Sequence, residues 1–195
     1  TFTLARNAGS TIVAAAGNES TSLPSYPAAY TGVISVSAVD INKQLAPYSN
    51  YGFTVDVAAP GGDNSVDVNG DGYPDGVLSV AGDDSGGSIQ YVYKFYQGTS
   101  MAAPHVTGII ALMKSVFSDL SPANIDSLLV SGEITDELGT PGRDDLFGYG
   151  LINARKAVDM ATILAQGTVI EVPSISVSPA ALNFGATGTI VALSI

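Results

Sequence analysis

Residues 100–117 have the sequence "SMAAPHVTGIIALMKSVF". Nearly every residue is small or apolar, and the stretch is long enough for about five turns of helix. A helix that is apolar all round is expected to be buried on every side. The preceding residues 89–97, "IQYVYKFYQ", alternate aromatic and polar residues, as a strand with one wet face would. Ser100 is therefore predicted to lie where a strand leads into a buried helix.

Short apolar runs and helical patterns alternate through the rest of the chain. The run "STIVAAAG" at residues 10–17 has the continuous apolar character of a buried parallel strand. Further strands are predicted at residues 32–40, 54–61 and 76–82, and further helices at residues 2–9, 121–132 and 153–165. Strands that alternate with helices indicate a layered α/β fold with a mainly parallel sheet.

The composition excludes several classes of protein. The chain has 195 residues, of which 46% are hydrophobic and 13% charged, and this is typical of a compact globular protein. Its net charge of -11 would repel nucleic acid and anionic lipid, so neither is an expected partner. Cysteine is absent, which excludes disulfides and thiolate metal sites. No apolar run approaches the ~20 residues that span a bilayer.

The two ends of the chain carry patterns of their own. Thr1 stands within a sequence that already has a helical pattern, so we expect a cut or processing point there and no signal peptide. Residues 1–166 are predicted to form one domain. Residues 167–195 have no helical period and several β-branched residues, and we interpret them as a linker followed by the first strands of an incomplete all-β module.

The chemistry around Ser100 alone leaves two interpretations. A helix N-terminus presents unpaired amide N–H groups and a partial positive charge, which suit an oxyanion formed beside a nucleophilic serine. Gly98, Ala102 and Ala103 are small and leave room for the backbone of a substrate. The alternative is that Ser100 only caps the helix, although a capping box would place Glu or Gln where Ala103 stands.

Several segments resemble the subtilisin-like serine proteases. The stretch "GTSMAAPHVTG" at residues 98–108 is similar to the motif around the nucleophile of that family. The stretch "IVAAAGNES" at residues 12–20 resembles the strand whose asparagine completes the oxyanion hole. The segments "YPAAYTGVISVSAVD", "APYSNYGFTVDVAAPG" and "GYGLINARKAV" also match in order and spacing. The resemblance covers about residues 1–165 and implies part of a three-layer subtilisin-like α/β fold.

The resemblance implies a role for each matching residue. Ser100 would attack the scissile carbonyl, and its backbone N–H would donate to the oxyanion together with the side-chain amide of Asn18. The residues implied in substrate binding are Ala15, Ala16, Gly17, Gly98 and Thr99. The first three would form one wall of the pocket for the side chain that precedes the scissile bond. Their small size implies an open pocket that admits large apolar or aromatic groups.

The only histidine of the chain does not have the position of a general base. His105 follows Ser100 by five residues on the same predicted helix, and this spacing does not place two residues on one face. The resemblance gives His105 a structural role in the helix core. In the family the triad runs Asp, His, Ser along the chain, and no Asp or His precedes Asn18. We therefore expect the C-terminal part of a longer or nicked protease, inactive alone, or else an inactive relative.

Residues 67–75, "DVNGDGYPD", have the spacing of a calcium-binding loop. Side-chain oxygens recur at alternate positions, and a glycine permits the sharp turn. The predicted ligands are Asp67, Asn69, Asp71, Asp75 and the backbone carbonyl of Tyr73. An EF-hand would place Glu at the position of Leu78, so another carboxylate, such as that of Asp63 or Asp83, would have to complete the set. The alternative is a solvated turn without metal.

The sequence leaves two functions from different classes. The first is a secreted or cell-surface serine endopeptidase that cleaves proteins or peptides through an acyl-enzyme on Ser100. Its partner would be the missing N-terminal part of the same catalytic domain, and a structural calcium would order the protruding loop and protect it from autolysis. The second is a non-catalytic calcium-binding surface module on a protease-like fold.

Overall fold

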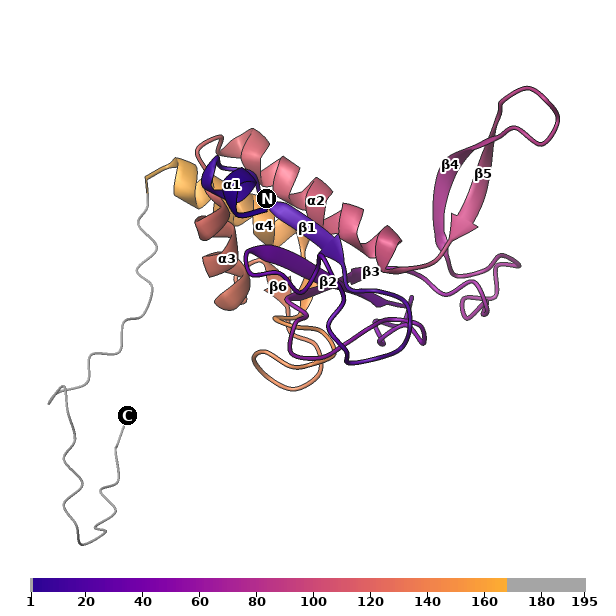
Figure 1. The fold of residues 1–195 in the computed structure, drawn as a ribbon, viewed down its shortest axis with the longest axis horizontal. Coiled ribbons are helices and arrows are strands. Elements are labelled where there is room, and N and C mark those ends of the chain that lie inside the picture. The colour runs from indigo at the N-terminus through magenta and orange to yellow at the C-terminus, as the bar shows by residue number, and fades with distance from the viewer. Residues whose placement is uncertain (1, 168–195) are drawn as a thin grey trace, which may run out of the picture.

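The computed structural model describes residues 2–167, and a five-stranded sheet lies at its centre (Figure 1). Along the sheet the strands are β1 (Ile12–Ala15), β2 (Val33–Val39), β3 (Val57–Pro60), β7 (Leu151–Ile152) and β6 (Thr135–Asp136). The pairs from β1 to β7 are parallel, and only β6 runs antiparallel to its neighbour. The predicted α/β fold with a mainly parallel sheet is confirmed.

The strand β2 is buried along its whole length. It pairs with β1 on one side, where Val13 lies opposite Ile34, and with β3 on the other, where Val36 lies opposite Val57. All seven residues of β2 are buried, because both faces of the sheet are covered at this strand. Ser35 and Ser37 alternate with the apolar residues of β2 and are fully buried as well, so these small polar side chains are covered together with their apolar neighbours.

The helices α2 (Thr99–Val116), α3 (Pro122–Val130) and α4 (Ala154–Ala165) share one hydrophobic core with one face of the sheet. The short helix α1 (Phe2–Asn7) precedes β1 and has no buried residue. These elements confirm the four predicted helices. Ser121 caps α3 by accepting the N–H of Asn124, with Pro122 at the helix start, and Asn153 caps α4.

The helix α2 lies across the sheet in Figure 1 and packs on β1, β2 and β3. Its buried residues recur at helical spacing and are Thr99, Ala102, Val106, Ile110 and Met113. The expectation of burial on every side is wrong for the described residues, because Leu112 is 51% exposed and Gly108 has open space beside it. Within residues 2–167 no segment covers this outer face of α2.

The loop between β6 and β7 covers the other face of the sheet. Phe147 packs there with Val39, Ala58 and Leu151 in a second, smaller core. The described residues therefore show one layer of helices, the sheet, and a loop on the far face.

The hairpin of β4 (Val77–Asp83) and β5 (Gln90–Tyr96) projects from the body, beside the start of α2 (Figure 1). Leu78 and Tyr93, on one face, are 55% and 76% exposed, and Ser79 and Lys94 on the other face are exposed as well. The expectation of one wet face on β5 is therefore wrong, since a projecting hairpin meets solvent on both faces.

The linker and all-β module were predicted for residues 167–195. Of these, only Gly167 is among the described residues. The boundary drawn after residue 166 stays a prediction, although α4 ends just before it, at Ala165.

Candidate active site

Ser100 is the second residue of α2 and is exposed. The N-cap of the helix is Gly98, with a φ of 142°, and no side chain caps the helix by a hydrogen bond. Ser100 is therefore not the helix cap. Its backbone N–H belongs to the first turn of α2, where amide donors have no partner within the helix. The serine hydroxyl and an amide donor that has no partner within the helix thus lie together at the positive end of α2.

Asn18 reaches the same place from the loop that follows β1. Its Oδ1 accepts two hydrogen bonds from Thr99, at 2.8 Å from the backbone N and at 2.9 Å from Oγ1. A backbone N–H can only donate, so the amide oxygen must face Thr99 and Nδ2 must point away from it. Within residues 2–167 this Nδ2 has no hydrogen-bond acceptor, and Asn18 is exposed. The side chain thus presents a free donor beside Ser100.

The loop that carries Asn18 is held by Asn50. The side-chain Nδ2 of Asn50 donates to Ala16 O at 3.1 Å, and its Oδ1 accepts from Glu19 N at 2.9 Å. The backbone N of Asn50 donates to Gly17 O at 3.0 Å. Because these contacts fix the backbone on both sides of Asn18, its amide is oriented before any ligand arrives.

The small residues predicted to contact substrate surround this amide. Gly17 has a φ of 112° and donates its N–H to Thr99 Oγ1 at 3.2 Å. A Cβ at Gly98 would lie 3.6 Å from Asn18 Nδ2, so Gly98 lies directly against the amide. Ala15 ends β1, and the buried Ala16 follows it. The structure thus brings Gly17, Asn18, Gly98, Thr99 and Ser100 together, and the pocket wall of Ala15, Ala16 and Gly17 stays a prediction.

Tyr48 and Asn50 belong to the site, although no sequence motif predicted a role for either residue. The Oη of Tyr48 accepts from Gly98 N at 2.9 Å and donates to Gly62 O at 2.7 Å. Burial raises the pKa of this phenol to about 12, so it remains protonated and able to donate. Both residues lie within the segment "APYSNYGFTVDVAAPG", whose match to the family was the only signal. No local spacing links residue 48 to residue 98.

His105 does not lie in the helix core. It is exposed, and its Nδ1 lies 2.8 Å from the carbonyl oxygen of Met101, one turn earlier on α2. The expectation of a core position is wrong for the described residues, because His105 lies on the uncovered outer part of α2.

The loop of residues 67–75 winds around Asp67. Its carboxylate accepts from the backbone N of Gly70 at 2.8 Å and of Gly72 at 2.9 Å. Asn69 Oδ1 accepts from Asp71 N at 2.9 Å in the same way. Gly70 and Gly72 have φ values of 72° and 86°, which glycine adopts without strain. The turn that glycine was expected to permit is therefore present.

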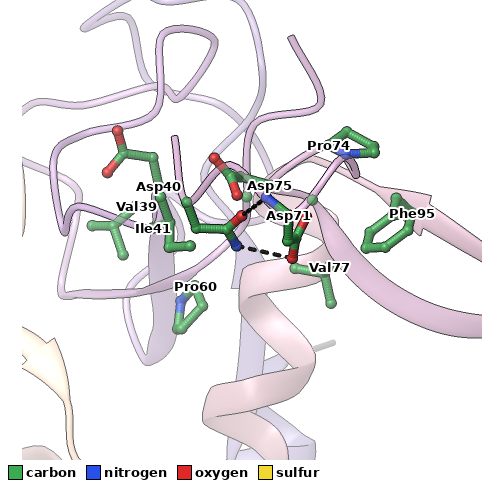
Figure 2. A pocket seen from close by; sticks show the side chains of 12 residues that line it. Val39, Asp40, Ile41, Pro60, Asp71, Pro74, Asp75, Val77 and Phe95 are labelled. Atoms are coloured by element: carbon green, nitrogen blue, oxygen red, sulfur yellow. Dashed lines mark hydrogen bonds between the residues drawn. The ribbon is translucent and has the colours of Figure 1, made fainter. Parts of the chain in front are cut away.

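The predicted metal ligands are only partly gathered. Asn69, Asp71 and Asp75 line a pocket of about 230 Å³ between the ends of β2 and β3 and the base of the hairpin (Figure 2). Asp67 is not among the residues that line it, and Tyr73 instead stacks its ring on Phe95 at 5.8 Å. In the described part of the chain no three Asp, Glu, His or Cys side chains are arranged to hold a metal ion. The oxygens engaged with N–H groups keep further lone pairs, so the donor chemistry still suits calcium.

An exposed serine hydroxyl beside two oriented N–H donors is the arrangement of hydrolases that form an acyl-enzyme and stabilise an oxyanion. Residues 2–150 match the subtilase family of peptidases. The chain belongs to this family.

The relatives are proteases. The chain is 39% identical over 152 residues to a thermophilic serine proteinase of Bacillus sp. strain AK1. The matched stretch covers 78% of this chain and 31% of the relative. It is 36% identical over 156 residues to an extracellular protease of Xanthomonas campestris, which covers 78% of this chain and 24% of the relative. A solved protease structure from Pseudoalteromonas arctica superposes with a TM-score of 0.70 at 39% identity, over 82% of this chain and 45% of that one. The chain therefore spans less than half the length of these proteins.

Proposed function

We propose that this chain is the nucleophile-bearing part of a serine endopeptidase that cleaves proteins or peptides through an acyl-enzyme on Ser100. One observation carries the proposal. Asn18 Oδ1 accepts two hydrogen bonds from Thr99, so Asn18 Nδ2 points away from Thr99. Within residues 2–167, Asn18 Nδ2 and the Ser100 N–H are therefore donors without an acceptor beside the serine hydroxyl. Such donors would stabilise negative charge that develops next to the serine.

The proposed reaction has two halves. Ser100 Oγ attacks the carbonyl carbon of the scissile bond while a general base takes its proton, and the carbonyl oxygen becomes an oxyanion between the two N–H donors. The tetrahedral intermediate then expels the amine, which takes the proton from the base, and the acyl-enzyme is left. Water, activated by the same base, attacks the acyl carbon and releases the acid and Ser100 Oγ–H.

The base and its carboxylate would come from a segment outside this chain. His105 is engaged with Met101 O and belongs to the helix of Ser100 itself, so it does not supply the base. The outer face of α2, with Leu112 and Gly108 uncovered, and the free edge of β1 would receive that segment. A covering segment would remove the exposed apolar surface of Leu112 from water.

The chain alone is therefore expected to hydrolyse no peptide. We call this chain together with a segment that carries the aspartate and histidine the complemented protein. Hydrolysis of a fluorogenic peptide by the complemented protein, and none by either part alone, is the expected result, since the serine needs a base. Measurable Ser100-dependent hydrolysis by this chain alone would contradict the assignment of the base to another segment.

The small residues of the β1 end suggest the substrate preference. The wall of Ala15, Ala16 and Gly17 would admit large apolar or aromatic side chains before the scissile bond. Relatives named as extracellular proteases support secretion or the cell surface as the location. In the described residues no helix has the length and apolar character to cross a membrane.

We further propose that the loop of residues 67–75 binds a structural calcium ion. Asp67, Asn69, Asp71, Asp75 and the Tyr73 carbonyl would hold it, with Asp71 and Asp75 already on one pocket. A calcium ion would offset the repulsion of the three carboxylates of Asp67, Asp71 and Asp75 and order the loop next to the hairpin.

Calcium at a hundredfold excess over its Kd is expected to stabilise the protein by about 2.7 kcal/mol, which corresponds to a rise in Tm of roughly 5–10 °C. Asp71→Ala should lose this response, and a chelator should reverse it in the unsubstituted protein. Asp84→Ala, in the hairpin turn outside the loop, is the matched control and should respond fully. A Tm that calcium leaves unchanged in all three proteins would contradict a bound ion.

The loop also supports a second function, a non-catalytic calcium-binding surface module. That alternative predicts the calcium response without any hydrolysis by the complemented protein. The endopeptidase predicts hydrolysis that depends on Ser100, so the two assays on the same samples separate the functions.

A further inference from the structure

The hydroxyl of Tyr48 connects two points of the chain that lie on either side of the excursion formed by residues 63–97. It donates to Gly62 O at 2.7 Å, just before the excursion, and accepts from Gly98 N at 2.9 Å, just after it. The ring of Tyr48 packs against the main core, so the hydroxyl is held from the body of the protein. The phenol therefore ties the residue before α2 to the core.

Gly98 has little freedom to move without disturbing the active site. Its N–H also donates to Gly61 O at 3.0 Å, and its carbonyl accepts from Met101 N at 2.9 Å in the first turn of α2. The next residue, Thr99, is fully buried and holds Asn18 Oδ1. A shift of Gly98 would thus move both the Thr99 donors and the start of the helix that carries Ser100.

The close approach of the three segments also explains a glycine. A Cβ at Gly61 would lie 2.8 Å from Tyr48 Oη and 2.9 Å from Gly98 O, both closer than carbon and oxygen normally come. Ala38 Cβ is nearer still to that position, so the packing of Ala38, Tyr48 and Gly98 together leaves no space for a side chain at residue 61.

A purely structural clasp at the base of the excursion exists separately. Asn64 Nδ2 donates to Phe95 O at 3.2 Å, and Asn64 N donates to Gln97 Oε1 at 2.5 Å. Asn64 touches neither Gly98 nor Asn18 in these contacts. It therefore offers a control that loosens the same excursion without touching the residue before Thr99.

We propose that Tyr48 is a positioning residue of the active site: its hydroxyl fixes Gly98 and so holds Thr99 and Asn18 in the oxyanion-binding arrangement. The proposal concerns the reaction given under the proposed function and rests on it. Tyr48 touches no reacting atom and acts through Gly98 alone.

The test compares Tyr48→Phe with Asn64→Ala in the complemented protein, using a fluorophosphonate as the probe. Tyr48→Phe keeps the ring and removes one neutral hydrogen-bond donor and acceptor, so the second-order rate constant for labelling of Ser100 should fall about five- to tenfold. Gly98 keeps Gly61 O as an acceptor, so the effect is partial. Amide exchange of Gly98 and Thr99, followed by NMR, should be faster in Tyr48→Phe. Asn64→Ala should change neither quantity.

Three results would overturn the proposal. One is a Tyr48→Phe protein whose labelling rate constant and amide exchange rates equal those of the unsubstituted protein. Another is an equal loss in Asn64→Ala, which would assign the effect to the excursion as a whole. The third arises when the unsubstituted protein is not labelled, so that the proposed function fails by itself. Unchanged exchange at Gly98 and Thr99 in Tyr48→Phe then overturns the positioning role, and faster exchange supports it.

Discussion

Replacing Ser100 by alanine is expected to lower kcat of the complemented protein by about a millionfold, close to the uncatalysed background. The figure is the one known for the nucleophile of a subtilisin and does not come from this geometry. The physical reason is that Ala has no oxygen to form the acyl-enzyme, and only the oxyanion donors and substrate binding remain. Peptide hydrolysis followed over hours, with a protease-free blank, measures the loss.

Ser127→Ala is the matched control for this replacement. Ser127 lies on α3, away from the outer face of α2, is exposed, and within residues 2–167 its hydroxyl donates to Ala123 O. Its replacement should leave kcat within about twofold, because a surface substitution of this kind shifts energies by about half a kcal/mol at most. Hydrolysis that survives in Ser100→Ala would show that another residue is the nucleophile.

Replacing Asn18 by alanine is expected to lower kcat a hundredfold to a thousandfold, roughly, with KM little changed. This magnitude too is already known for the corresponding donor of a subtilisin. The amide of Asn18 is exposed and oriented by Thr99, so it stabilises charge that exists only in the transition state. The measurement is the separate determination of kcat and KM on one peptide substrate.

Asn42→Ala controls for a general effect of losing an exposed asparagine. Asn42 lies in the turn after β2 and is exposed, and within residues 2–167 its backbone N–H donates to Asp40 Oδ1 while its side chain makes no hydrogen bond. Its replacement should leave both constants unchanged. A rise in KM with constant kcat in Asn18→Ala would show that Asn18 binds substrate in the ground state and is not an oxyanion donor.

The helices and the longer strands of this fold could be predicted because each has a local cause, whereas the two-residue strands β6 (Thr135–Asp136) and β7 (Leu151–Ile152) were not predicted, since so short a segment shows no periodicity. The apolar run of β2 has two sheet neighbours, and Ser121 and Pro122 start α3 by capping and by a preset backbone angle. Burial of α2 was overestimated, since hydrophobicity shows that a face needs cover but not whether the cover lies in the same chain.

The candidate site was predictable only in part, for a similar reason. The motif around Ser100 and the strand before Asn18 are each a continuous stretch of sequence, and the match of each stretch to a known family was enough to predict both residues. The contact of Tyr48 with Gly98 joins residues fifty positions apart, and no helical or strand period relates them. Such long-range hydrogen bonds depend on tertiary packing, which a single sequence does not display.

The mass of the complemented protein after treatment with a fluorophosphonate, followed by peptide mapping, tests whether Ser100 is the nucleophile. An active serine nucleophile should acquire one adduct per molecule, located on Ser100, and Ser100→Ala should acquire none. An unlabelled but folded protein, or an adduct that persists in Ser100→Ala, would contradict the assignment of Ser100 as the nucleophile of a serine endopeptidase.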